Sequence, residues 1–229
     1  MSPVSVKKNK DLTRFHQELV NSLLAQAGPV KPMTSPWAQW SLWILLATAL
    51  VFLALWRMKP THLDASVQPT AIGYLITLFL SAALAAWQAV VSSIPGRPSG
   101  SWQLVLLTVF LATIIIIFPF VFFVPKGEEI FEMDNIVKCW PDCFKAIFLI
   151  GILPWILLGW RLSQNASFNA RWTGAWSGLS AFLLGSLVTL MRCGYWEAGH
   201  MLAVHLLTVA IFSFLTTWLG AMWFSRWKR

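Results

Sequence analysis

The residues best suited to chemistry are three cysteines and a histidine in the second half of the chain. Cys139 and Cys143 lie four positions apart, and Cys193 precedes His200 by seven positions. Thiolates and imidazoles are the ligands that zinc and softer metals prefer. If the segment that begins at Cys143 packs beside the one that ends near Cys193, then Cys139, Cys143, Cys193 and His200 form a candidate site for a soft metal ion.

Other interpretations of these residues stay open. Their spacing matches no standard zinc motif, so the cysteines could be small apolar residues of the core. Two of them could instead form a disulfide in an oxidising compartment. Pro141 suits the first turn of a helix, which would put Cys143 near a helix N-terminus, where the dipole favours thiolate. His205 lies five residues beyond His200, on a different face of an α-helix, so we predict a packed histidine rather than a ligand.

Six long apolar segments must position these residues. The chain is 57% hydrophobic and only 11% charged, whereas soluble domains carry about a quarter charged residues. A transmembrane helix needs about 20 predominantly apolar residues, and the sequence predicts such spans at about 37–56, 71–94, 102–124, 143–160, 172–191 and 198–224. It therefore indicates an all-α, polytopic membrane protein with its transmembrane domain over residues 37–229, surrounded by the lipid bilayer.

The distribution of basic residues predicts that both termini lie in the cytoplasm. Lysines and arginines are enriched in cytoplasmic loops of membrane proteins, and this orientation puts most of them there, while most Asp and Glu fall on the other side. The three cysteines and His200 would then face the periplasm, outside a bacterial inner membrane. The net charge of +8 does not indicate direct nucleic-acid binding, because the basic residues cluster where loops meet a membrane.

Residues 1–36 form a separate cytoplasmic segment with a short amphipathic helix over about 10–27. The apolar residues at helical spacing on one face are Leu12, Phe15, Leu19, Val20 and Leu23. Gly28 and Pro29 then end the helix. Such a face must be buried, either on the membrane surface or in a groove of a soluble partner.

The fifth predicted span carries glycines at small-residue spacing. Gly174, Gly178 and Gly185 share one helical face, which allows another helix to approach closely. The simplest interpretation is packing within the chain, and the alternative is a homodimer formed through this face.

Several landmarks along the chain occur together in one known family. They are the segment Asp11-Leu12 through Leu23-Leu24, the spacer Pro29-Val30-Lys31-Pro32, Cys143 followed by Ile150 to Pro154, the glycines Gly174, Gly178 and Gly185, and Cys193 followed by His205, Gly220 and Trp227. This layout resembles the NrsF family of bacterial membrane anti-sigma factors, the negative regulators of sigma F. The departures are Val204 where an aromatic residue is commoner, the missing arginine beside Gly220, and the additional Cys139.

The resemblance implies a function for both ends of the molecule. The helix face with Leu12, Phe15, Leu19, Val20 and Leu23 would bind a cytoplasmic sigma factor of the extracytoplasmic-function type and keep it from RNA polymerase. Cys143 and Cys193 would sense a metal or an oxidant. The sequence carries no HExxH, GxSxG or phosphate-binding glycine loop, so we do not predict an enzyme. The alternatives are a small-solute or metal transporter, a membrane thiol or quinone oxidoreductase, and a structural subunit.

Overall fold

The computed structural model describes residues 17–22, 34–58, 69–94, 115–119, 133–165, 169–193 and 195–224. The chain divides into two compact units, Met1–Thr34 and Ser35–Arg229. In the first unit, residues 17–22 are helical, with Leu19 and Val20 both exposed. The rest of the helix predicted over residues 10–27, including Leu12, Phe15 and Leu23, lies outside the described residues.

The second unit is built from helices. Its elements are α2 (Pro36–Met58), α4 (Pro69–Ser92), α6 (Met133–Ser163), α7 (Ala170–Arg192), α8 (Ala198–His200), the π-helical segment η1 (Met201–Leu206) and α9 (Leu207–Phe224). All regular structure in the described residues is helical, as the sequence predicts.

Five helical segments in the described part of the chain are long and apolar enough to cross a membrane. They are Pro36–Leu53, Pro69–Ser92, Val137–Ser163, Ala170–Arg192 and Ala198–Phe224. They correspond to five of the six predicted spans. Of the remaining predicted span, 102–124, only residues 115–119 are described, and these are helical.

Helix α6 is longer than the sequence predicts. It begins at Met133 rather than near residue 143, and Pro141 lies inside it. Two predictions are therefore wrong: the helix starts about ten residues before the predicted span at 143–160, and Cys143 does not lie near a helix N-terminus. The physical reason is that the apolar run marks only the part of a helix that a bilayer can hold, whereas backbone hydrogen bonding continues into the exposed turns that carry Pro141 and Asp142.

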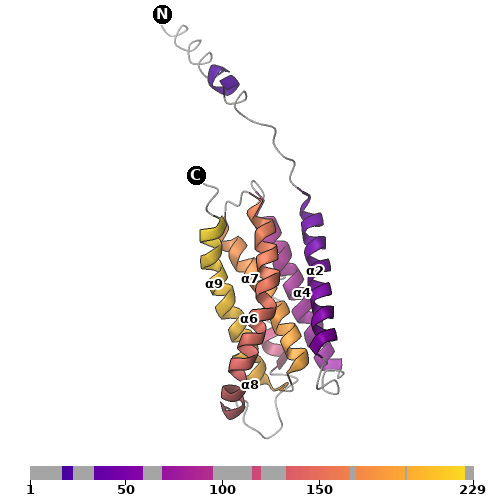
Figure 1. The fold of residues 1–229 in the computed structure, drawn as a ribbon. Helices are drawn as coiled ribbons and strands as arrows, with labels where there is room; N and C mark the ends of the chain where they lie inside the picture. The colour runs from indigo at the N-terminus through magenta and orange to yellow at the C-terminus, as the bar shows by residue number, and fades with distance from the viewer. Residues whose placement is uncertain are drawn as a thin grey trace, which may run out of the picture. The chain divides into compact units, whose positions relative to one another are not determined.

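Helix α7 is the centre of the bundle. It packs against α4, α6 and α9 (Figure 1). Of its 23 residues, 15 are buried, whereas Trp43 and Ala47 are the buried residues in the described part of α2. A Cβ atom on Gly174 would collide with the backbone of Thr216 and Gly220, and one on Gly178 would collide with the Thr216 side chain. The glycine face thus serves packing within the chain, because α9 already occupies it.

The third glycine of this face sets the distance between α6 and α7. A Cβ atom on Gly185 would lie 2.6 Å from the carbonyl oxygen of Ile147 and 3.2 Å from the backbone nitrogen of Gly151. The two helices are antiparallel neighbours (Figure 1). Because Ile147 follows Cys143 by one turn and Gly185 precedes Cys193 by about two turns, this close crossing brings the two cysteines together.

At the end of the bundle away from Cys143 and Cys193, a cluster of polar side chains connects three helices. Asn165, two residues after the end of α6, donates hydrogen bonds from Nδ2 to Oε1 of Gln39 in α2 (3.1 Å) and to Oγ of Ser93, which directly follows α4 (2.7 Å). Asn165 and Ser93 are buried. Buried polar groups are retained when their hydrogen bonds are satisfied, so this cluster fixes α2 against α6.

Candidate metal centre

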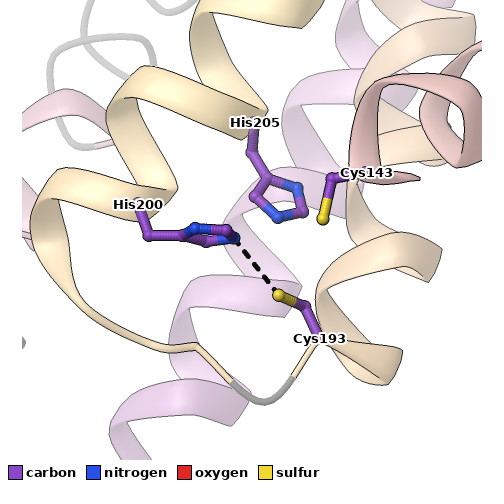
Figure 2. Close-up of side chains that lie close together, drawn as sticks. All are labelled: Cys143, Cys193, His200 and His205. Carbon is purple, nitrogen blue, oxygen red and sulfur yellow. Dashed lines mark hydrogen bonds between the residues drawn. The ribbon is translucent and has the colours of Figure 1, made fainter. Parts of the chain in front are cut away.

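Two cysteines and two histidines converge at one end of the bundle. Cys143 comes from α6, Cys193 directly follows α7, His200 ends α8 and His205 lies in η1. One ligand atom from each residue can be chosen so that all four atoms lie within 4.8 Å of one another. Figure 2 shows the four side chains pointing into the same space, and all except the half-buried Cys193 are buried.

The π-helical segment explains why His205 joins this group. In an α-helix, residues five apart are turned about 140° from each other. In a π-helix the hydrogen bonds join residues five apart, as seen where the Leu207 N–H bonds the carbonyl of Leu202. The imidazole rings of His200 and His205 therefore lie 5.3 Å apart between their centroids. The prediction that His205 lies on a different face was wrong, because it assumed α-helical periodicity.

Cys193 is held at the end of α7 and lies against a histidine. Its backbone N–H bonds the carbonyl of Thr189 at 2.8 Å, which closes the last turn of the helix. Its Sγ lies 3.2 Å from Nε2 of His200 (Figure 2). The hydrogen bond from the Cys143 thiol, together with the one to His200, holds the pKa of the Cys193 thiol below its usual range. These contacts favour thiolate, the form that binds metals.

The histidines leave ring nitrogens available to a ligand. Oγ of Ser186 lies 3.4 Å from Nδ1 of His205. Nε2 of His205 and Nδ1 of His200 are buried, and neither has a hydrogen-bond partner among the described residues. Buried polar atoms are seldom left unpaired in folded proteins. A metal ion bound by Nε2 of His205 would give this buried nitrogen a partner.

The four residues fit a tetrahedral metal ion of the zinc type. Two thiolates and two imidazoles are a standard donor set for such ions, with metal–ligand distances near 2.3 Å and 2.0–2.1 Å. A tetrahedron of that size places ligand atoms about 3.3–3.8 Å apart. The upper limit of 4.8 Å between the ligand atoms exceeds this by only about 1 Å, so small side-chain movements would close the set around an ion.

A cavity gives solutes a path to the two thiols. It has a volume of about 510 Å³, and its lining includes Cys143, Cys193 and the charged side chains of Asp142, Lys145 and Arg192. All three cysteines are free thiols. An ion or an oxidant that enters this cavity would therefore meet Cys143 and Cys193 directly.

Three of the four sequence-predicted ligands, Cys143, Cys193 and His200, are brought together. The fourth, Cys139, lies one turn before Cys143 on α6, is half-buried and is not a member of the cluster. Its thiol instead lies near Tyr195 and raises the pKa of that phenol. His205 takes the fourth place, and a signal for it did exist, because His205 is among the landmarks that carry the family resemblance.

Comparison with known families decides where the chain belongs. A family model described as NrsF, negative regulator of sigma F, matches residues 23–227. The chain belongs to the NrsF family. No curated protein and no solved structure matches it. Of the five predicted partner-binding residues of this NrsF protein, only Leu23 falls inside the matched range.

Membership agrees with the architecture. NrsF proteins are described as negative regulators of sigma F, and the five apolar helices are those of a membrane protein. The chain thus has the helices of a membrane protein and belongs to a family of sigma-factor regulators. It also carries a Cys/His cluster able to hold a metal ion.

Proposed function

We propose that this NrsF-family protein is an anti-sigma factor of the bacterial inner membrane that releases its sigma factor when the Cys/His cluster binds a metal or is oxidised. Both termini lie in the cytoplasm. One observation supports this proposal most directly: Cys143, Cys193, His200 and His205 converge in a member of a family of sigma-factor regulators.

Capture of the sigma factor is assigned to the N-terminal segment. Leu12, Phe15, Leu19, Val20 and Leu23 form one apolar helix face, and a groove on a sigma factor of the extracytoplasmic-function type would bury it. Leu19 and Val20 are 46% and 50% exposed, so this part of the face is available to a partner. A sigma factor held there is kept from RNA polymerase.

Sensing is assigned to the cluster at the other side of the membrane. A soft or borderline divalent ion would be held by the two thiolates and two imidazoles. Alternatively, Cys143 and Cys193 would form a disulfide, giving up two protons and two electrons to an oxidant. Either event draws α6 and the end of α7 together, because each contributes one of the two cysteines.

Helix α6 offers a direct connection between the two sides. From Cys143 to Asn165 the chain runs 22 residues, about 33 Å at a helical rise of 1.5 Å per residue, which matches the hydrocarbon thickness of about 30 Å. Asn165 is hydrogen-bonded to Gln39 near the start of α2, and α2 directly follows the N-terminal segment. A shift of α6 on ligand binding would therefore reach the base of the segment that holds the sigma factor.

The interior of the bundle does not favour a transporter. Buried hydroxyl groups of α4 and α7 donate to backbone carbonyls: Ser81 to Thr77, Ser177 to Gly174, Ser180 to Ala82 and Thr189 to Gly185. Three of these hydrogen bonds each lie within a single helix, and the bond from Ser180 joins α7 to α4. Outside the Cys/His cluster, the buried polar atoms without a hydrogen-bond partner among the described residues are the hydroxyl of Tyr74, Nε2 of Gln88 and Oγ1 of Thr208. A solute pathway would need a longer series of free polar or ionisable groups.

Co-purification tests the capture face. The full-length chain, solubilised in mild detergent, should retain its sigma factor, whereas Leu19→Asp should lose it while still inserting into the membrane. Gln17→Asp is the matched control, because it adds the same charge to the same exposed helix outside the apolar face. Capture that survives Leu19→Asp, or that both variants lose equally, would show that this face does not bind the sigma factor.

A further inference from the structure

We infer that Ser186 is a positioning residue of the metal centre: its hydroxyl holds Nδ1 of His205 so that Nε2 points at the ion. This inference rests on the proposed metal centre. Ser186 and His205 are both fully buried, and Oγ of Ser186 lies 3.4 Å from Nδ1. Nε2, on the opposite side of the ring, has no partner among the described residues.

Helix α7 places this serine in register with a ligand. Ser186 precedes Cys193 by seven residues, which is close to two full helical turns, so both lie on the side of α7 that faces the cluster. The helix thus supplies a thiolate at its end and a supporting hydroxyl two turns earlier. Ser186 thus contacts Nδ1 of His205, while Cys193 belongs to the cluster that His205 joins.

The Ser186 hydroxyl can decide which ring nitrogen of His205 is free to bind a metal. A neutral histidine has one protonated ring nitrogen, and only the other nitrogen can bind a metal. When Nδ1–H donates to Oγ of Ser186, Nε2 carries the free electron pair. When the hydroxyl donates to Nδ1 instead, Nε2 keeps the proton and cannot bind. Serine accommodates both states, and an arriving ion selects the first, as in sites where a ligating histidine donates its second N–H to a neighbouring group.

The test compares Ser186→Ala with Ser186→Thr and Ser180→Ala in the full-length chain in detergent. Threonine restores the hydroxyl. Ser180 is the control for packing, because it is a buried α7 serine whose hydroxyl donates to the carbonyl of Ala82 at 2.7 Å, in α4. The probe is Co²⁺, measured by chelator competition and by its visible absorption, which reports the geometry of the ligands around the ion.

We expect Ser186→Ala to weaken Co²⁺ binding about 10- to 100-fold and to shift the visible absorption bands, while Ser186→Thr and Ser180→Ala bind as the unsubstituted chain does. Unchanged affinity and absorption in Ser186→Ala would overturn the role of Ser186 and leave the metal centre standing. An equal loss in Ser180→Ala would also overturn that role, because it would indicate general packing. If the unsubstituted chain binds no Co²⁺, the metal centre itself is wrong, and the role of Ser186 falls with it.

Discussion

Replacing His205 by leucine tests the structural ligand set against the one predicted from the sequence. The structure groups Cys143, Cys193, His200 and His205, whereas the sequence predicts Cys139 in place of His205. The variants His205→Leu and Cys139→Ser therefore separate the two sets. Leucine is chosen because His205 is fully buried and an apolar side chain can fill the space.

The expected loss follows from the number of ligands. Structural zinc sites with four protein ligands bind with an apparent free energy of about 10–16 kcal/mol. Divided evenly over four ligands, this is about 2.5–4 kcal/mol each, and about 1.4 kcal/mol corresponds to a tenfold change in affinity. His205→Leu should thus weaken Zn²⁺ binding about 100- to 1,000-fold, and Cys139→Ser should leave it unchanged.

The assay is competition between the purified full-length protein and a chromophoric chelator for Zn²⁺. Thermal unfolding of each variant without metal serves as the control, because leucine leaves the buried Ser186 hydroxyl without its partner, at a cost of about 1–3 kcal/mol. If His205→Leu binds Zn²⁺ normally and Cys139→Ser does not, the structural set is refuted and the sequence set is correct.

Three further predictions concern packing, transmission and redox state. Gly178→Ala should destabilise the bundle by about 1–3 kcal/mol in thermal unfolding, since its Cβ meets Thr216; a normal melting temperature would contradict the close α7–α9 contact. Gly73→Ala, whose Cβ among the described residues meets only Phe118, at 3.8 Å, is the control and should be neutral or slightly stabilising. Asn165→Ala removes two hydrogen bonds and should lower stability by about 1–3 kcal/mol, and it should weaken the metal response of sigma-factor release; a full response would exclude this route. Mild oxidation should join Cys143 to Cys193 and protect both from alkylation while Cys139 still reacts, whereas a disulfide to Cys139, detected by mass spectrometry, would contradict the grouping.

The fold could largely be predicted because a bilayer imposes a strong constraint on sequence. Five of the predicted spans correspond to helices in the structure, with boundaries that agree within a few residues except at the start of α6. That start was missed because hydropathy detects the membrane-embedded part of a helix and is insensitive to polar turns beyond it. The role of the glycines in packing was also predictable, since small residues at helical spacing permit close contact whichever helix is the neighbour.

The candidate site could be predicted only in part. Residue type alone singled out Cys143, Cys193 and His200, because thiols and imidazoles are scarce in apolar spans. His205 was excluded by α-helical geometry, and only the π-helical segment η1 reverses that conclusion. Such segments have no reliable sequence signature, but they are frequent at functional sites. The role of Ser186 could not be predicted for a different reason. It depends on which ring nitrogen of His205 the hydroxyl contacts, and a sequence does not show this.

The most direct test of the account is sigma-factor release from the purified complex on addition of metal. The full-length chain with its bound sigma factor, in detergent, is titrated with Zn²⁺ and then Cd²⁺, and the released sigma factor is measured by size-exclusion chromatography. We predict release from the unsubstituted complex and retention by the double variant Cys143→Ser, Cys193→Ser. Metal that binds the unsubstituted chain without releasing the sigma factor, or releases it equally from both complexes, would contradict the coupling on which the proposed function depends.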